Sequence, residues 1–105
     1  MQASSEKSAS VTVRPCFVYM IADLTNEKPR TYVGWTNDLD SRIAAHNTAK
    51  GAKATRGGIW TLVHSEAYKT RSAAMQAEYA LKKNRILRKS LLTQYLTQTA
   101  STDQP

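Results

Sequence analysis

The fold is decided by the stretch CFVYMIADLTNEKPRTYVGWT (16–36), which places two strand-like runs around one polar turn. The first run, CFVYMIAD (16–23), and the second, TYVGWT (31–36), are rich in aromatic and β-branched side chains, which favour strands. The segment between them, LTNEKPR (24–30), carries Asn26 and Pro29, which are typical of turns. The pattern therefore predicts an antiparallel hairpin.

A helix is expected directly after this hairpin. Thr36 or Asn37 can cap its start, Asp38 suits its first turn, and the helix should run to about residue 48. The basic, glycine-containing segment TAKGAKATRGG (48–58) that follows is predicted to be a loop.

The second half of the chain repeats the change from strand to helix. A third strand is expected in IWTLVHSEAY (59–68), followed by a helix that Thr70 or Ser72 caps and that ends near residue 84. A further basic helix should cover residues 86–97. The order ββαβα plus a C-terminal helix predicts an α+β fold, with a small three-stranded antiparallel sheet flanked by helices.

The length of 105 residues is enough for one domain. The polar residues 1–13 are expected to form a disordered arm, residues 14–97 the domain, and residues 98–105 a flexible tail. No apolar run approaches the roughly 20 residues that span a membrane, and the N-terminal residues have no stretch of signal-peptide type. A cytoplasmic protein is the expectation.

The charge favours a polyanionic partner. Fifteen Lys and Arg residues against eight Asp and Glu residues give a formal charge of +7. Nucleic acid is the commonest partner of such a surface, and a generic basic protein is the simpler alternative. Cys16 is the only cysteine, which excludes an internal disulfide and a cysteine-rich zinc site, and its apolar neighbours predict a buried residue.

Two polar residues interrupt the apolar stripe of the first predicted helix. Leu39 and Ile43 mark that stripe, and Arg42 and His46 fall within about 60° of Leu39 at 100° per residue. One helical turn apart, Arg42 and His46 could converge on one pocket. The alternative is an Arg whose stem covers apolar surface beside a structural His.

Glu78 has a similar position on the later helix. Ala74, Ala77 and Leu81 define the apolar face of that helix, and Glu78 lies at its edge. A carboxylate at a core-facing edge is where a metal site would place one. A surface ion pair with Lys82, four residues later, is the simpler interpretation.

Two tyrosines lie on the hairpin strands. Tyr19 is in the first strand and Tyr32 in the second, where packing alone would explain both. Gly34, two residues after Tyr32, leaves a strand position without a side chain, which often allows a close approach. His64 is expected to be a strand residue with a hydrogen-bond partner.

Together these residues resemble the GIY-YIG nuclease superfamily, above all its small stand-alone bacterial branch and the Slx-type structure-specific endonucleases. The resemblance covers about residues 16–92. It rests on FVY (17–19), YVGWTNDLDSRIAAHN (32–47), GAKATRGG (51–58), IWTLVHSE (59–66) and Glu78. The first motif begins with Phe17 where many relatives have Gly, and no separate DNA-recognition domain fits in the chain.

The resemblance implies a GIY-YIG fold and a metal-dependent endonuclease that hydrolyses DNA, with a link to DNA repair or recombination. Glu78 would hold one Mg²⁺ or Mn²⁺, which keeps several waters and so needs few protein ligands. Arg42 would bind the phosphate with its planar fork. Tyr32, assisted by His46, would position or deprotonate the attacking water, and Tyr19 would complete the pocket. Which tyrosine is the base stays open.

The remaining basic residues would then contact phosphates on either side of the cut, unless they form only a solvated face. A non-catalytic nucleic-acid-binding module is the second interpretation, and a basic adaptor for an acidic protein the third. The substrate structure, DNA against RNA, the oligomeric state and a partner that supplies specificity are left open. The residues predicted to bind nucleic acid are Lys50, Lys53, Arg56, Lys82, Lys83, Arg85, Arg88 and Lys89.

Overall fold

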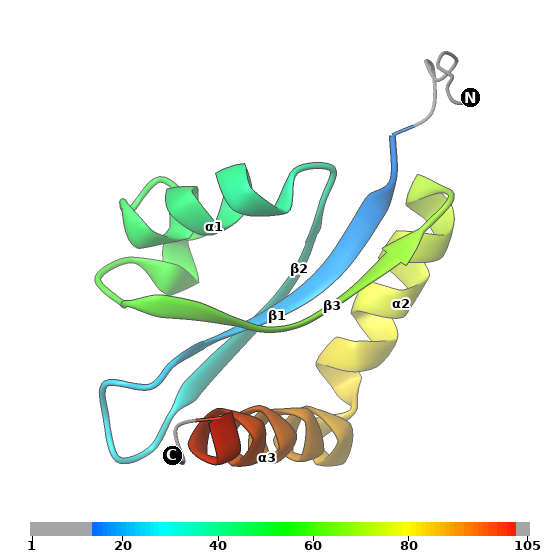
Figure 1. The fold of residues 1–105 in the computed structure, drawn as a ribbon. Helices are drawn as coiled ribbons and strands as arrows, with labels where there is room; N and C mark the ends of the chain where they lie inside the picture. The colour runs from blue at the N-terminus through cyan, green and yellow to red at the C-terminus, as the bar shows by residue number, and fades with distance from the viewer. Residues whose placement is uncertain (1–13, 103–105) are drawn as a thin grey trace, which may run out of the picture.

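A computed structural model describes residues 14–102, and the predicted arm 1–13 and residues 103–105 lie outside the described residues. Within this range the strands and helices follow the predicted order (Figure 1). They are β1 (Cys16–Asp23), β2 (Arg30–Thr36), α1 (Leu39–Asn47), the short 3₁₀ turn η2 (Lys53–Thr55), β3 (Trp60–Tyr68), α2 (Arg71–Lys83) and α3 (Arg85–Thr102).

The strands form one antiparallel sheet in the order β2-β1-β3, which confirms the predicted α+β architecture. β1 is the central strand, and seven of its eight residues are buried. Its pairing places Tyr19 opposite Gly34 of β2 and Ser65 of β3. The register with β3 shifts between Met20 and Ile21, where a bulge interrupts the ladder.

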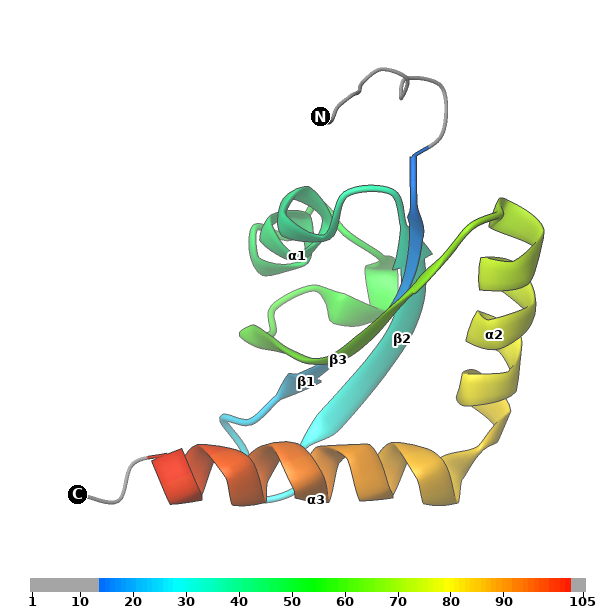
Figure 2. The ribbon, with the colours of Figure 1, turned by 45° about the vertical axis from the view of Figure 1, so that its right-hand side comes forward.

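Helices cover both faces of the sheet, because side chains along a strand point alternately to opposite faces. Val18 and Met20 pack toward α2 and α3 in one cluster. Tyr19 and Ile21 belong to a second cluster, which includes Leu39 and Ile43 of α1. Figure 2 shows α1 on one side of the sheet, and α2 and α3 meeting at a bend, called here the α2–α3 elbow.

The caps explain where the helices begin. Thr70 accepts a hydrogen bond from the backbone N–H of Ala73 at 3.0 Å, as expected. The predicted cap of α1 at Thr36 or Asn37 is wrong. Asp38 caps α1 instead, because its carboxylate accepts from the backbone N–H of Ser41 at 3.1 Å.

The last helix is longer than predicted. α3 begins at Arg85 and continues to Thr102, so residues 98–102 of the predicted tail are helical. The polar Thr and Gln residues of this segment suggested a tail, but they only lower helix propensity slightly, and no Gly or Pro interrupts the helix before Pro105. Among residues 14–102, no helix has the length and apolar character to cross a membrane.

Candidate active site

Tyr19 lies at the centre of the site and reaches across the sheet. Its side chain is buried, and a Cβ atom built on Gly34 would lie only 2.5 Å from its hydroxyl oxygen. The phenol ring of β1 therefore extends over the empty position on β2, as the glycine in this strand suggested. Any side chain larger than hydrogen at Gly34 would displace Tyr19.

His46 is completely buried and holds Tyr19 on the other side. Its Nε2 lies 2.7 Å from the Tyr19 hydroxyl, and its Nδ1 lies 2.8 Å from the Thr55 hydroxyl. Thr55 donates its only hydroxyl hydrogen to the carbonyl of Ala52 at 2.8 Å. Thr55 must therefore accept from Nδ1–H, which leaves Nε2 as the acceptor for the Tyr19 hydroxyl. The hydrogen bonds therefore all run one way: Tyr19 donates to His46, His46 donates to Thr55, and Thr55 donates to the Ala52 carbonyl.

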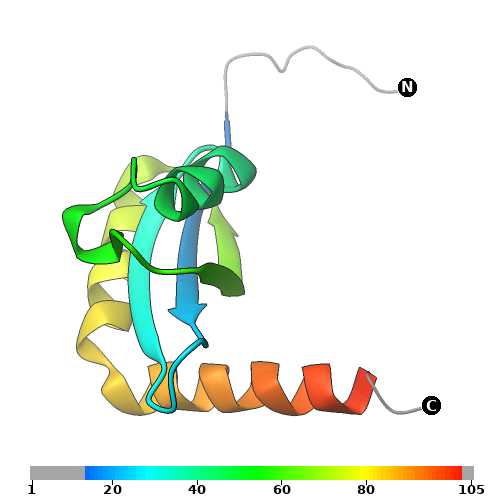
Figure 3. The same ribbon diagram turned by 90° about the vertical axis from the view of Figure 1, so that its left-hand side faces the viewer.

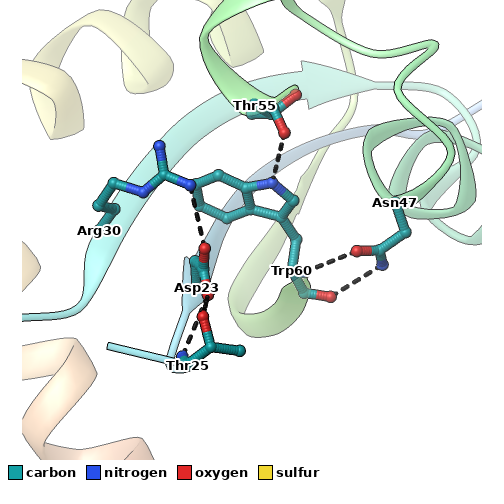
Figure 4. Close-up of polar contacts among 6 residues, drawn as sticks. All are labelled: Asp23, Thr25, Arg30, Asn47, Thr55 and Trp60. Carbon is teal, nitrogen blue, oxygen red and sulfur yellow. Dashed lines mark hydrogen bonds and ion pairs between the residues drawn. The ribbon is translucent and has the colours of Figure 1, made fainter. Parts of the chain in front are cut away.

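The loop that carries Thr55 is fixed by Trp60 (Figure 4). The indole N–H of Trp60 donates to the Thr55 carbonyl at 2.8 Å. The backbone N–H and C=O of Trp60 bond the side-chain amide of Asn47, at 2.6 and 2.9 Å. The end of α1, η2 and the start of β3 are therefore joined into one support for His46. The sequence reasoning missed Thr55, because a threonine inside a basic loop carries no periodic signal.

The other side of Trp60 is held by an ion pair (Figure 4). The Arg30 guanidinium lies 5.2 Å from the centre of the Trp60 ring and 3.0 Å from the Asp23 carboxylate. Asp23 also accepts from the hydroxyl and the backbone N–H of Thr25. The hydrogen bonds from Thr25 and Arg30 lower the pKa of the Asp23 carboxyl to about 2. This ionised group anchors the hairpin end beneath the loop.

Tyr32 lies beside His46, but the two side chains share no hydrogen bond. Their ring centres are 5.1 Å apart and the ring planes are inclined by 58°. Both nitrogens of His46 are already bonded, to Tyr19 and Thr55, so neither is left for the Tyr32 hydroxyl. His46 therefore supports Tyr19 by hydrogen bonding and Tyr32 only by ring contact.

The charges of Arg42 and Glu78 both act on the Tyr19 hydroxyl. Burial raises the pKa of Tyr19, the Arg42 guanidinium beside it lowers the pKa, and the Tyr32 and Glu78 groups raise it further. Arg42 comes from α1 and Glu78 from α2, on opposite faces of the sheet. His46 therefore contacts both tyrosines, and the charges of Arg42 and Glu78 both act on the Tyr19 hydroxyl.

Glu78 also forms the ion pair with Lys82 that the sequence offered as the simpler interpretation of this carboxylate. Its carboxylate lies 3.5 Å from the Lys82 ammonium, and its side chain is 19% exposed while that of Lys82 is 49% exposed. A pair this open contributes only about 0.5 kcal/mol to stability. The carboxylate therefore stays accessible to a competing cation.

The donor set limits what kind of metal the site can hold. Within residues 14–102, no three His, Cys, Asp or Glu side chains come together. Glu78 therefore has no second or third ligand of the kind that a protein zinc site uses among the described residues. A single hard oxygen ligand fits Mg²⁺ or Mn²⁺, which retain waters and take further oxygens from a phosphate.

The predicted nucleic-acid-binding residues fall into separate groups. Lys50, Lys53 and Arg56 are exposed on the loop around η2. Lys83 lies on the outer face of α2, with its ammonium 4.9 Å from the centre of the Tyr79 ring. Arg88 donates to the carbonyls of Leu81, at 2.9 Å, and Lys82. Lys82, Arg85 and Lys89 lie on the side of the α2–α3 elbow that faces β2.

His46 gives a testable pH dependence. Burial, and to a smaller extent Arg42, lowers the pKa of His46 below its ordinary 6.5. The unfolded chain therefore binds more protons below pH 6.5, so the contribution of His46 to the free energy of unfolding should be constant above that pH and fall as the pH drops below it. Urea unfolding of the His64→Gln variant isolates this effect, since the chain has only two histidines. Unfolding that becomes harder at lower pH would show that His46 is charged in the folded protein.

Sequence similarity agrees with this geometry. Residues 15–89 match the family model of the GIY-YIG catalytic domain. The chain is 50% identical over 52 residues to a UPF0213 protein of Bacillus velezensis, spanning 49% of this chain and 52% of that protein. It is 41% identical over 78 residues to a UPF0213 protein of Vibrio campbellii, spanning 73% of this chain and 72% of that protein.

A solved structure is also similar. It is the solution structure of the UPF0213 protein BH0048 from Bacillus halodurans, with 36% sequence identity, a TM-score of 0.43, and coverage of 75% of this chain and 83% of that one. The family match over residues 15–89 and the similarity to the Vibrio campbellii protein define the class of protein. The chain belongs to the GIY-YIG catalytic domain family. It spans only about half the length of the Bacillus velezensis relative.

Proposed function

We propose that this chain is a metal-dependent endonuclease that hydrolyses phosphodiester bonds in DNA. The observation that carries the proposal is that Arg42 and Glu78, on helices of opposite faces of the sheet, both act electrostatically on the Tyr19 hydroxyl, which His46 holds at 2.7 Å. A binding protein needs positive charge on a surface. A guanidinium, a carboxylate and two phenols in one site instead fit the groups that phosphodiester hydrolysis requires.

Each residue has a role that follows from its contacts. Glu78 would hold one Mg²⁺ or Mn²⁺, and the bound cation would supply positive charge for the phosphate oxygens. Arg42 binds the same phosphate with its planar fork. The Tyr19 hydroxyl donates to His46, so its oxygen can accept a second hydrogen bond from the attacking water.

The general base is better assigned to Tyr32 than to Tyr19. Burial raises the pKa of Tyr19, and its proton is already committed to a neutral His46. Tyr32 would therefore position or deprotonate the water. The water oxygen then bonds to phosphorus while the bond from phosphorus to the departing sugar oxygen breaks; the water's proton passes to Tyr32 as the phenolate, and the departing oxygen takes a proton from solvent.

The finer features of the function rest on the resemblance to the Slx-type endonucleases. We propose a preference for DNA structure rather than sequence, a role in repair or recombination in the cytoplasm, and a protein partner that supplies further specificity. The formal charge of +7 supports attraction to any nucleic acid, so RNA is kept as an arm of the test.

The test is an incubation of the purified chain with branched, duplex and single-stranded DNA and with RNA, each with Mg²⁺, Mn²⁺ or chelator. We expect cleavage of at least one DNA with either cation and none with chelator. Cleavage of RNA and of no DNA would show that the substrate is RNA rather than DNA. Binding of DNA without cleavage of any substrate would overturn the proposal.

That last outcome would support a non-catalytic nucleic-acid-binding module. The Glu78–Lys82 ion pair favours this second function, because it gives the carboxylate a structural partner without a metal. In that case chelator should leave binding unchanged, and Glu78→Gln should behave as the wild type does.

A further inference from the structure

Two adjoining cavities lead away from the candidate site along the start of β2. One cavity of about 240 Å³ is lined by Tyr32, its two neighbours in β2, Lys82 and Arg88. A second cavity of about 210 Å³ continues toward Arg85 and Lys89 on α3. Both cavities share Thr31 and Arg88, so they adjoin, and together they are called here the elbow groove.

The elbow groove is positively charged along its length. Four cations line it, and no carboxylate is among its lining residues. Arg85 and Lys89 are four residues apart on α3, which places them on one face of the helix and about 6 Å apart along its axis. Lys82 stands at the end nearest to Tyr32, next to Glu78.

One of the four cations is already committed to the fold. Arg88 is half-buried and donates to the carbonyls of Leu81 and Lys82, where α2 ends. These contacts join the first turn of α3 to the last turn of α2 and fix the bend between them. Arg88 therefore shapes the floor of the elbow groove, while Arg85 and Lys89 are exposed beside it.

We propose that the elbow groove binds the nucleic-acid backbone on one side of the reacting phosphate. This rests on the proposed function, since the groove begins at Tyr32 and carries the charge that a row of phosphates requires. The occupant enters at the candidate site and leaves between the hairpin turn at Pro29 and α3. Phosphate contacts of this kind position a strand without reading its sequence.

Lys83 provides the matched comparison. It belongs to the same basic run in the sequence, but it lies on the outer face of α2 against Tyr79 and does not line the elbow groove. Lys69 is exposed between β3 and α2 and also lies outside the groove. Replacing both removes the same charge from the molecule as replacing Arg85 and Lys89.

The experiment compares Arg85→Gln/Lys89→Gln with Lys69→Gln/Lys83→Gln. Binding to a short fluorescein-labelled DNA, as a single strand and annealed to its complement, is titrated at several salt concentrations in chelator. The groove variant should make the slope of log affinity against log salt shallower by up to about 2 on duplex and about 1.4 on the single strand. The control variant should keep the wild-type slope.

Cleavage assays separate this inference from the proposed function. With Mg²⁺, the groove variant should raise KM and leave kcat within a fewfold of wild type, because neither residue reaches the reacting phosphate. Equal slopes of log affinity against log salt in the two variants would overturn the proposed role of the elbow groove even if the wild type cleaves. A shallower slope in the groove variant alone would uphold it even if no variant cleaves.

Discussion

Replacing Glu78 by Gln is expected to abolish cleavage and to leave the fold and nucleic-acid binding intact. The amide is nearly isosteric with the carboxylate but removes the one charged ligand available for a cation within the described site. Loss of the bound cation removes several kcal/mol of transition-state stabilisation, so the rate should fall at least about a thousandfold. Single-turnover cleavage with Mg²⁺ measures the effect.

The control is Glu66→Gln, which removes an exposed carboxylate from β3 on the face that α2 and α3 cover. That variant should cleave as the wild type does. Thermal unfolding should place both variants within about 1 kcal/mol of wild type, because Glu78 loses only its ion pair with Lys82 and the exposed Glu66→Gln side chain keeps an acceptor oxygen for the Tyr68 hydroxyl. Normal cleavage by Glu78→Gln would remove this carboxylate from the mechanism and favour the binding module.

The fold could be predicted from the sequence because its local signals agree with its tertiary packing. The hairpin has two β-rich runs around a turn, and the helices have caps and apolar stripes at the right spacing. The errors lie at element ends. Asp38 replaced the two predicted caps of α1 because three consecutive residues there can all accept a hydrogen bond.

The candidate site was predictable for a different reason. Polar groups at helix positions that should be apolar, Arg42, His46 and Glu78, are conspicuous in a single sequence. The hydrogen-bond partners of these groups cannot be recognised in a single sequence. Thr55 fixes the tautomer of His46 through a loop whose shape depends on Trp60 and Asn47, and such long-range hydrogen bonds leave no periodic trace.

The basic run was the least predictable part. Its five cations in eight residues look uniform in sequence, but the α2–α3 elbow separates them. Arg88 donates to backbone carbonyls at the end of α2, and Lys83 lies against the Tyr79 ring. Lys82, Arg85 and Lys89 face β2. Figure 3 shows α2 and α3 meeting below the start of β2. Helical period alone could not give this division, since it depends on where the chain bends.

Arg42→Lys is expected to slow cleavage about a hundredfold, which corresponds to the loss of about 3 kcal/mol of transition-state stabilisation. Lysine keeps the positive charge but loses the planar pair of donors that matches a phosphate. Arg42 also lowers the pKa of both Tyr19 and His46. Lysine should largely preserve those charge effects, so the substitution isolates the geometry of the fork.

Arg42→Ala completes the argument, because it removes both geometry and charge. The pKa of His46 should then rise toward its ordinary value, which NMR titration of the imidazole can follow without any substrate. Cleavage by Arg42→Ala should be slower than by Arg42→Lys, measured under single turnover at saturating DNA. If Arg42→Lys instead cleaves at the wild-type rate while Arg42→Ala does not, only the charge matters at this position. The proposed two-pronged contact between Arg42 and the phosphate would then be wrong.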